Sequence, residues 1–354
     1  MRFMLRQIVV LMAALGAGAT AAQTLPPGPK VAVTAVTQSS PTIAQFTRVD
    51  QPILADVAKR TNGRIEFTVR TFTEMNLGGA EILRLVRSGQ VDIAMATLTT
   101  VSGDVPLLDG FDLAGMNLTA DQARKVADAL VPYANKELER LGVRIISTFP
   151  FFGQIFYCNK PIAGMADLKG LKVRSFGPSL GDMLQAIGAQ PVSIPIAEVY
   201  PALERGTVDC AATGSGNGYG TRLFDVSTHQ YTMVWSWATA AQFANLAWWN
   251  RLDPPVRAYI EGVYKEIQEA QWKLGAEGTQ DGIDCNAGRA AGCKIGSLPR
   301  RAMVEVKPTA ADTEMLRKVL SQNVLPNWVK RCGANCGELY NQVVAPITGV
   351  RYGG

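Results

Sequence analysis

The segment from Asp167 to Asp209 constrains the fold of this chain more than any other stretch, because strand-forming and helix-forming runs alternate along it. Its sequence is DLKGLKVRSFGPSLGDMLQAIGAQPVSIPIAEVYPALERGTVD. The pattern predicts a strand, a helix, a strand, a helix and a strand, which is typical of α/β folds with a largely parallel sheet. Arg174 stands where the first of these strands ends. A guanidinium group there can hold a carboxylate through two parallel hydrogen bonds, whereas lysine cannot reproduce that geometry.

The start of the chain has the pattern of a secretory signal peptide. Two arginines within the first six residues precede an apolar run, Ile8 to Ala17, and the small residues Ala19-Thr20-Ala21 follow it. The run is too short for a membrane span and is followed by a cleavage pattern. We expect residues 1–22 to be removed and the mature chain to be exported to the periplasm in soluble form.

Length and charge limit the classes of function. A mature chain of roughly 330 residues exceeds one ordinary hydrophobic core, so we expect two lobes. Loss of the two arginines in the signal peptide lowers the formal net charge from +5 to about +3. This excess is too weak to indicate nucleic-acid binding, and the basic pair Arg300-Arg301 is expected to be solvated surface.

Six cysteines in an exported chain favour disulfides. Fifteen pairings are possible for six cysteines, but short separation along the chain favours two local ones. Zinc is disfavoured, because His229 is the one histidine and the Cys-x3-Cys spacing is uncommon in zinc sites. The local pairs are Cys285 with Cys293 and Cys332 with Cys336, which leaves Cys158 and Cys210 either paired across two strands or as buried free thiols.

Strand-forming and helix-forming runs also alternate outside the segment from Asp167 to Asp209. A long helix is expected from Val256 to about Gly278, and the chain from Asp281 is expected to be loop-rich, with one more helix from Ala310 to about Asn323. The apolar runs Trp235 to Thr239 and Phe243 to Trp249 are expected to return the chain to the first lobe. In the first lobe, strands are predicted at 31–35, 65–69, 91–97 and 143–147, and helices at 40–59, 80–88 and 119–142.

One phrase nearly recurs. RLVRSGQVDIAMAT, Arg84 to Thr97, is similar to ALERGTVDCAATG, Ala202 to Gly214. Both predict a helix, a glycine cap and a strand of small residues, and small residues at a strand end leave backbone open to a ligand. A shared helix-to-strand connector would account for either copy alone. Two copies, one in each expected lobe, favour strand ends that face each other across a cleft.

Several of these motifs resemble one family. TNGRIEFTV followed by LGGAEILRLVRSGQVDIAMA is similar to the first lobe of the substrate-binding proteins of tripartite ATP-independent periplasmic (TRAP) transporters, the DctP-like family. DLKGLKVRSFG and LGAQPVSIPIAEVYPALERGTVD resemble its second lobe, and WNRLDP with the long helix after it also fits. The resemblance covers residues 30 to 275 approximately.

The resemblance implies an α/β, two-lobed periplasmic-binding-protein fold of type II character, with hinge strands and a long helix that spans both lobes. Lobe 1 would comprise residues 30–150 and about 241–283; lobe 2 would comprise 151–240 and about 284–354, with the disulfide-stapled C-terminal region. The resemblance also implies delivery of a carboxylate ligand to a membrane permease driven by an ion gradient, with Arg174 as the carboxylate-binding arginine.

The chain departs from the family pattern at two places. Many members carry a second arginine shortly before the segment that reads CNKPI here, where this chain has Phe151, Phe152, Gly153 and Gln154. Many members also have an asparagine where this chain has Thr213. Both changes reduce the polar grip on a ligand. They favour a monocarboxylate with an apolar or aromatic body over a small dicarboxylate.

Further ligand contacts are predicted from side-chain type and from proximity to strand ends. Phe151, Phe152 and Trp237 are candidates for an aromatic pocket wall, although core packing is an alternative for each. The polar candidates, besides Gln154 and Thr213, are Asn217 with Tyr219 in a glycine-rich loop, and Gln38, Ser39, Asn76, Gly78, Thr97 and Thr99 in the first lobe.

Two other classes of function remain as alternatives. An enzyme on this scaffold would need a nucleophile with a base or a metal cluster, and the sequence shows neither pattern. We therefore expect no catalysis, no cofactor and no metal ligand set specific to one ion. A periplasmic binding module for an ABC transporter or a sensor kinase would share the fold, so fold alone does not exclude it.

Overall fold

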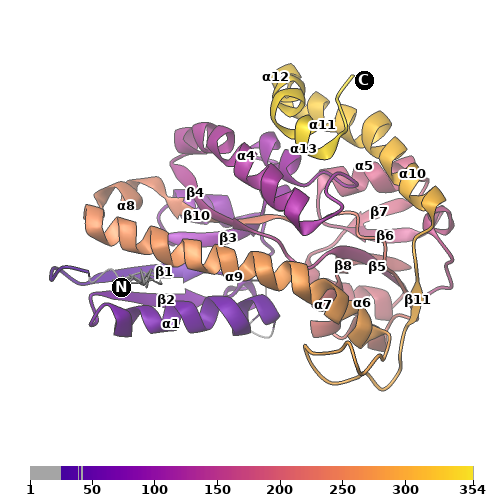
Figure 1. Ribbon diagram of the computed structural model, residues 1–354, viewed down its shortest axis with the longest axis horizontal. Coiled ribbons are helices and arrows are strands. Elements are labelled where there is room, and N and C mark those ends of the chain that lie inside the picture. Colours follow the sequence, from indigo (N-terminus) through magenta and orange to yellow (C-terminus); the bar gives the residue numbers. More distant parts are fainter. Residues whose placement is uncertain (1–24, 39, 41–42, 354) are drawn as a thin grey trace, which may run out of the picture.

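The protein folds into two lobes, each built on one β-sheet with helices packed against it (Figure 1). The computed structural model describes residues 25–38, 40 and 43–353. The predicted signal peptide and the candidate Ser39 lie outside the described residues. The two-lobed α/β fold predicted from the sequence is confirmed.

The sheet of lobe 1 has the strand order β2-β1-β3-β10-β4. β1 pairs in parallel with β2 and β3, whereas β10 inserts antiparallel between β3 and β4. The sheet is therefore mixed, because the returning chain supplies one strand in the opposite direction. The strands are β1 (Val31–Val36), β2 (Ile65–Arg70), β3 (Ile93–Thr97), β4 (Val143–Phe149) and β10 (Ala240–Asn245), and the helices of this lobe are α1 (Gln51–Arg60), α2 (Phe72–Met75), α3 (Ile82–Arg87), α4 (Ala120–Leu138) and α8 (Leu246–Arg251).

The sheet of lobe 2 has the order β11-β9-β5-β8-β6-β7. The segment from Asp167 to Asp209 forms most of its parallel part, since β6 pairs in parallel with both β7 and β8. β5 runs antiparallel to β8 and β9. The elements are β5 (Gln154–Cys158), β6 (Lys172–Ser175), α5 (Pro178–Ala186), β7 (Gln190–Ser193), α6 (Val199–Glu204), β8 (Cys210–Gly214), α7 (Ser215–Gly220), β9 (His229–Tyr231) and β11 (Val304–Val306).

The long helix α9 (Pro254–Asn286) crosses both lobes (Figure 1). Its first half buries Val256, Ile260 and Ile267 in the core of lobe 1. Its second half approaches lobe 2 so closely that a Cβ on Gly282 would lie 2.4 Å from the backbone nitrogen of Gly216. Small residues in this half thus let the helix pack closely against lobe 2, and the helix continues to Asn286, past its predicted end near Gly278.

The C-terminal region is helical, so the prediction of a loop-rich end is wrong beyond Asn323. α10 (Ala310–Val319) agrees with the predicted helix, and α11 (Leu325–Cys332), α12 (Ala334–Leu339) and α13 (Ala345–Thr348) follow. Pro326 and Pro346 each lie in a first helical turn, where proline is tolerated.

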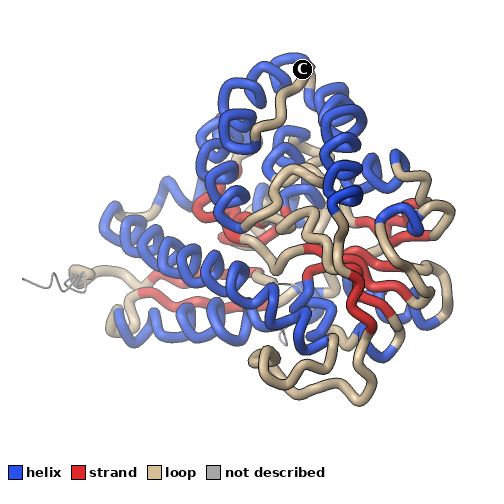
Figure 2. Tube along the Cα trace, turned by 45° about the vertical axis from the view of Figure 1, so that its right-hand side comes forward, coloured by secondary structure: helices blue, strands red, loops and turns tan. Residues whose placement is uncertain are grey.

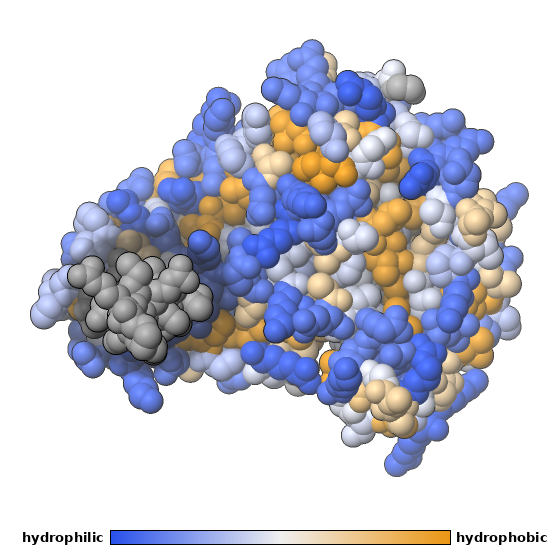
Figure 3. All heavy atoms as spheres, viewed as in Figure 1, coloured by the Kyte–Doolittle hydropathy of each residue, from blue (hydrophilic) through white to orange (hydrophobic). Residues whose placement is uncertain are grey.

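These C-terminal helices pack above both lobes (Figure 2). α11 contacts α5 of lobe 2, and it also contacts the 3-10 segment Pro106–Phe111 of lobe 1. α13 contacts α4 of lobe 1. Figure 3 shows mostly polar side chains on this face, with apolar ones gathered between α4 and the C-terminal helices. The C-terminal helices therefore contact both lobes.

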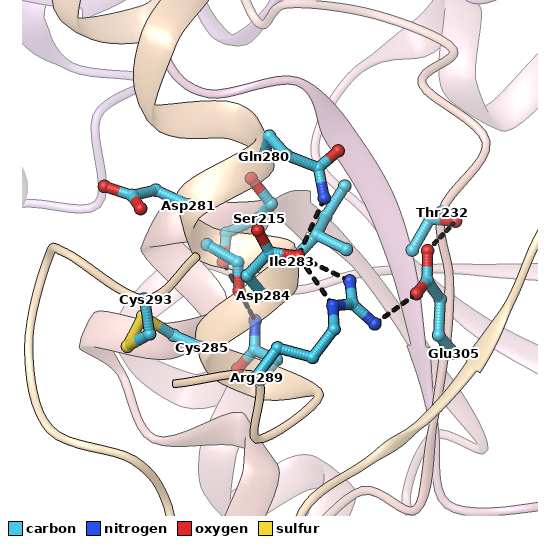
Figure 4. Close-up of polar contacts among 12 residues, drawn as sticks. Ser215, Thr232, Gln280, Asp281, Ile283, Asp284, Cys285, Arg289, Cys293 and Glu305 are labelled. Atoms are coloured by element: carbon cyan, nitrogen blue, oxygen red, sulfur yellow. Dashed lines mark hydrogen bonds and ion pairs between the residues drawn. A yellow bond between two sulfur atoms is a disulfide. The ribbon is translucent and has the colours of Figure 1, made fainter. Parts of the chain in front are cut away.

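All six cysteines are paired in disulfides. Cys158–Cys210 joins β5 to β8, which decides the pairing that the sequence left open. The two local pairs form as predicted, Cys285–Cys293 at the end of α9 and Cys332–Cys336 between α11 and α12. Figure 4 shows the first of these beside Arg289, which forms ion pairs with Asp284 and Glu305.

Candidate functional site

A cavity of about 590 Å³ lies between the two lobes. Lobe 1 contributes the end of β3, the turn after it and the glycine-rich segment before α3. Lobe 2 contributes the ends of β6, β7 and β8, and Phe151 and Ala238 line the cavity from the segments that connect the lobes. The strand ends of the repeated phrase, Thr97 and Thr213, line this one cavity, as the sequence predicted.

Arg174 supplies the charge of the cavity. Among the described residues that line it, Arg174 alone carries an ionisable group. Its side chain is 4% exposed, its Nε donates to the carbonyl oxygen of Ile194 at 2.9 Å, and its Nη1 donates to that of Ala212 at 2.6 Å. No carboxylate in the described part of the chain forms an ion pair with it. Burial lowers the pKa of Arg174 to about 9, so an anion in the cavity would relieve the cost of the buried cation.

Aromatic rings support the arginine. The guanidinium carbon of Arg174 lies 4.8 Å from the ring centre of Phe176, a distance typical of cation–π contacts. The ring of Phe176 in turn lies 6.1 Å from that of Trp235, which stacks on Phe156 at 5.7 Å. This packing restricts the rotamer of Arg174 and orients its free N–H groups.

Helix α5 begins at the cavity. Gly177 and Pro178 line it, and Pro178 occupies the first helical turn, where its missing N–H costs nothing. The positive end of the helix dipole therefore lies beside Arg174, and both features favour a negatively charged group.

The wall from lobe 1 carries hydroxyl groups. Thr99 donates its hydroxyl proton to Asp109. Thr100 donates to the carbonyl oxygen of Thr97 at 2.7 Å, and Ser102 donates to that of Thr99 at 2.8 Å. Thr99, Thr100 and Ser102 all line the cavity, so this wall is polar but uncharged.

A buried carboxylate organises the connecting segment around Ala238. Asp112 Oδ2 accepts hydrogen bonds from the hydroxyl of Ser236 at 2.7 Å and from the backbone N–H groups of Trp237 at 2.8 Å and Thr239 at 3.2 Å. Between them Ala238 has a φ of 46°, in the left-handed region. The turn directs Ala238 toward the cavity.

Six of the ten ligand contacts predicted in the sequence line the cavity. Arg174, the predicted carboxylate-binding residue, is among them, and Gly78 and Thr99 line the cavity as well. Whether each of these residues touches a ligand stays a prediction. The six are Arg174, Thr213, Phe151, Gln154, Asn217 and Thr97.

Two aromatic candidates lie elsewhere. Phe152 is 1% exposed and packs against Gly216 and Gly278, where a Cβ would lie within 2.5 Å of its ring. Phe151 and Phe152 lie in the bend between β4 and β5, where Phe151 lines the cavity and Phe152 packs in the core. Trp237 is also absent from the cavity lining, because the turn around Asp112 places its neighbour Ala238 there.

Three polar candidates from the sequence lie outside the cavity lining. Gln38 is buried, with Nε2 donating to Asp50 at 2.8 Å. Asn76 is exposed and ends α2 in the left-handed conformation. Tyr219 donates its hydroxyl proton to the carbonyl oxygen of Ser297.

Some lining residues escaped the sequence reasoning. Phe176 could have been found, since it stands two residues after Arg174 on the same strand end. Ala238, Thr100 and Ser102 gave no comparable signal, because alanine and hydroxyl residues occur in every kind of loop. No cluster of acidic, histidine or cysteine side chains suited to a metal ion is present within the described residues.

The chain matches the family model described as bacterial extracellular solute-binding protein, family 7 (DctP), over residues 36–305. A solute-binding protein of Albidiferax ferrireducens is 28% identical over 181 residues, which cover 51% of this chain and 53% of that protein, so the chain spans about half the length of this relative. The 2,3-diketo-L-gulonate-binding periplasmic protein of Escherichia coli is 26% identical over 230 residues, with 64% and 70% covered.

Solved structures share the fold. The Bordetella pertussis extracytoplasmic solute receptor DctP6, which binds pyroglutamic acid, superposes with a TM-score of 0.78 at 22% identity, covering 90% of this chain and 99% of that one. Because the family model matches well over half of the chain, this protein belongs to the DctP family, family 7 of the bacterial extracellular solute-binding proteins.

Proposed function

We propose that this protein is an extracytoplasmic receptor for a monocarboxylate with an apolar or aromatic body. The observation that carries the proposal is Arg174, a buried cation that lines the cavity without a carboxylate partner among the described residues. A buried charge of this kind is costly unless an opposite charge pairs with it. A ligand carboxylate is the partner that Arg174 and the start of α5 favour.

The rest of the cavity supports a single negative charge and an apolar body. No other ionisable side chain lines it in the described part of the chain, so a second carboxylate would be buried without a cation. Phe72, Phe151, Phe176 and Ile196 supply apolar walls. The Escherichia coli relative is named for a sugar acid with one carboxyl group, which accords with a single anchor.

The two-lobed architecture supports a closing motion. We place the moving units at residues 30–150 with about 241–283, and at 151–240 with about 284–354. Ligand binding between the lobes would favour the closed form, which a permease can recognise. The proposal includes export through a cleaved signal peptide at residues 1–22 and residence in the periplasm. There the receptor would deliver its ligand to a TRAP-type membrane permease.

Calorimetric titration with a panel of monocarboxylates tests the proposal. The parent protein should bind at least one member, and Arg174→Ala should lose this binding by about a hundredfold or more, since a charge-assisted bidentate contact is removed. Arg205→Ala removes an exposed arginine of the same lobe and should bind as the parent does. Equal affinity of Arg174→Ala and the parent would refute the role of the arginine.

Uptake by cells tests the partner. Co-expression with a TRAP permease should give uptake of the bound acid that stops when the ion gradient is dissipated. Uptake that requires ATP hydrolysis by an ABC permease would instead favour the other transporter class.

A further inference from the structure

The hydroxyl groups on the lobe 1 wall share an unusual limitation. A hydroxyl has one proton to donate and two lone pairs that accept. Thr99, Thr100 and Ser102 each give that proton to a protein acceptor. Toward the cavity these three groups can therefore act as hydrogen-bond acceptors and not as donors.

Asp109 fixes the direction of the hydrogen bond from Thr99. Its side chain is 2% exposed, and its Oδ1 also accepts from the hydroxyl of Ser179 at 3.1 Å. Burial raises the pKa of Asp109 above its usual 3.8, and Arg331, which lies 3.2 Å from Oδ2, opposes that shift by favouring the ionised carboxylate. The ionised carboxylate only accepts, so Thr99 is the donor to it.

The part of the opposite wall around Arg174 has the reverse polarity. Arg174 offers N–H groups alone, because a guanidinium has no acceptor, and α5 presents the positive end of its dipole. Gln154, Thr213 and Asn217 line the cavity with acceptor oxygens, so the purely donating part of lobe 2 is confined to Arg174 and the start of α5. A ligand that reaches from Arg174 to Thr99 must match both ends.

We propose that the ligand carries a hydrogen-bond donor, a hydroxyl or N–H group, at the end that meets Thr99, Thr100 and Ser102, in addition to the carboxylate at Arg174. This inference rests on the proposed function and narrows it to hydroxy acids and acids with an N–H group. A carbonyl or ether oxygen in the same place would meet the oxygen lone pairs of these three hydroxyls. Such a site rejects an analogue without the donor, because its acceptors are left unpaired.

Matched pairs of acids test the inference. The probes are monocarboxylates that differ only in a hydroxyl or N–H replaced by methoxy or N-methyl, such as 4-hydroxyphenylacetate with 4-methoxyphenylacetate and lactate with 2-methoxypropanoate. Each pair gives a ratio of dissociation constants by calorimetry. We expect the donor-bearing member of every binding pair to bind about tenfold tighter or better. Equal or tighter binding of the donor-free members would overturn the inference.

Variants separate selectivity from folding. Thr99→Val should reduce the ratio to about threefold or less, whereas Thr99→Ser, which keeps the hydroxyl, should preserve it. Thr313→Val removes a hydroxyl bonded to a helix carbonyl far from the cavity and should leave the ratio unchanged. A general loss of structure would weaken both members of a pair equally and keep the ratio, so an unchanged ratio in Thr99→Val also overturns the inference.

Asp109→Asn provides a second test of the same inference. Its amide can donate to Thr99 and free the hydroxyl proton, so the ratio should fall although residue 109 does not line the cavity. Failure of the proposed function would be recognised by a different result. If no acid of either kind binds the parent protein, the receptor proposal falls and this inference falls with it.

Discussion

Gly177 and Thr99 approach each other across the boundary between the lobes: a Cβ on Gly177 would lie 2.1 Å from Thr99 Oγ1. The backbone of Gly177 is extended, with a φ of −170°, so its conformation does not require glycine. The requirement comes from the neighbouring lobe. Lobe 2 can approach lobe 1 this closely only because residue 177 has no side chain.

Gly177→Ala should therefore weaken acid binding by about tenfold or more, because overpacking forces the lobes apart. The free energy of unfolding of the ligand-free protein should change little. Gly181→Ala is the matched control, since no atom lies within 4 Å of its Cβ, and it should bind normally while gaining up to about 1 kcal/mol of helix stability. Calorimetry and urea unfolding measure the two effects; undiminished affinity of Gly177→Ala would contradict the close contact.

Arg331 links the C-terminal helices to both lobes. It forms ion pairs with Asp109 of lobe 1 at 3.2 Å and with Asp182 of α5 at 2.7 Å. Arg331→Ala should lower the free energy of unfolding by about 1–3 kcal/mol, because it leaves the buried Asp109 carboxylate without its cation. Lys330→Ala, an exposed change on the same helix, should stay within about 0.5 kcal/mol of the parent. Equal urea midpoints for both variants would contradict this role.

Stability should depend on pH through Asp112. Burial raises the pKa of Asp112 above its usual 3.8, despite the hydrogen bonds that it accepts. The folded protein then holds the proton more tightly than the unfolded chain. This group's contribution to stability is fully present below 3.8 and is lost as pH rises through the raised folded pKa.

Asp112→Asn cannot titrate, so its free energy of unfolding should fall less than that of the parent between mildly acidic and neutral pH. Urea unfolding at a series of pH values gives the two slopes. Asp104→Asn, at an exposed position, should retain the parent slope. The prediction fails if the Asp112 variant and the parent have parallel profiles.

The disulfides should contribute different amounts to the free energy of unfolding. Cys158–Cys210 closes a loop of 52 residues, and Cys332–Cys336 one of 4 residues. In the chain-entropy account, replacing both cysteines by alanine should cost about 4 kcal/mol for the first pair and about 2 kcal/mol for the second. Urea unfolding of the two double variants measures the difference, and the reverse order would refute it.

Arg174 should lower the free energy of unfolding of the ligand-free protein, although acid binding requires it. Arg174→Met keeps the length of the side chain without the buried charge, whose desolvation lowers the pKa of the arginine. We expect this variant to lose acid binding while the ligand-free protein unfolds at an equal or higher urea concentration. A large loss of stability would mean that the bonds to Ile194 and Ala212 outweigh the desolvation.

Local patterns in the sequence were sufficient to predict several strands of the fold and one central residue of the candidate site. The alternation between Asp167 and Asp209 determined the parallel strands β6, β7 and β8, because strand and helix periods are written in neighbouring residues. The recurrent phrase indicated that Thr97 and Thr213 end strands of similar design. Arg174 could be singled out because one residue type at a strand end has a specific chemistry.

Only the tertiary structure decided which side chains reach the cavity. Phe151 and Phe152 are neighbours with the same chemistry, and the bend between β4 and β5 places them in different surroundings. Ala238 reaches the cavity because Asp112, distant in sequence, holds the turn around it. Helices after Asn323 form because their apolar faces find partners on both lobes. Contacts between residues far apart in the chain decide these outcomes, and such contacts leave no periodic signal in the sequence.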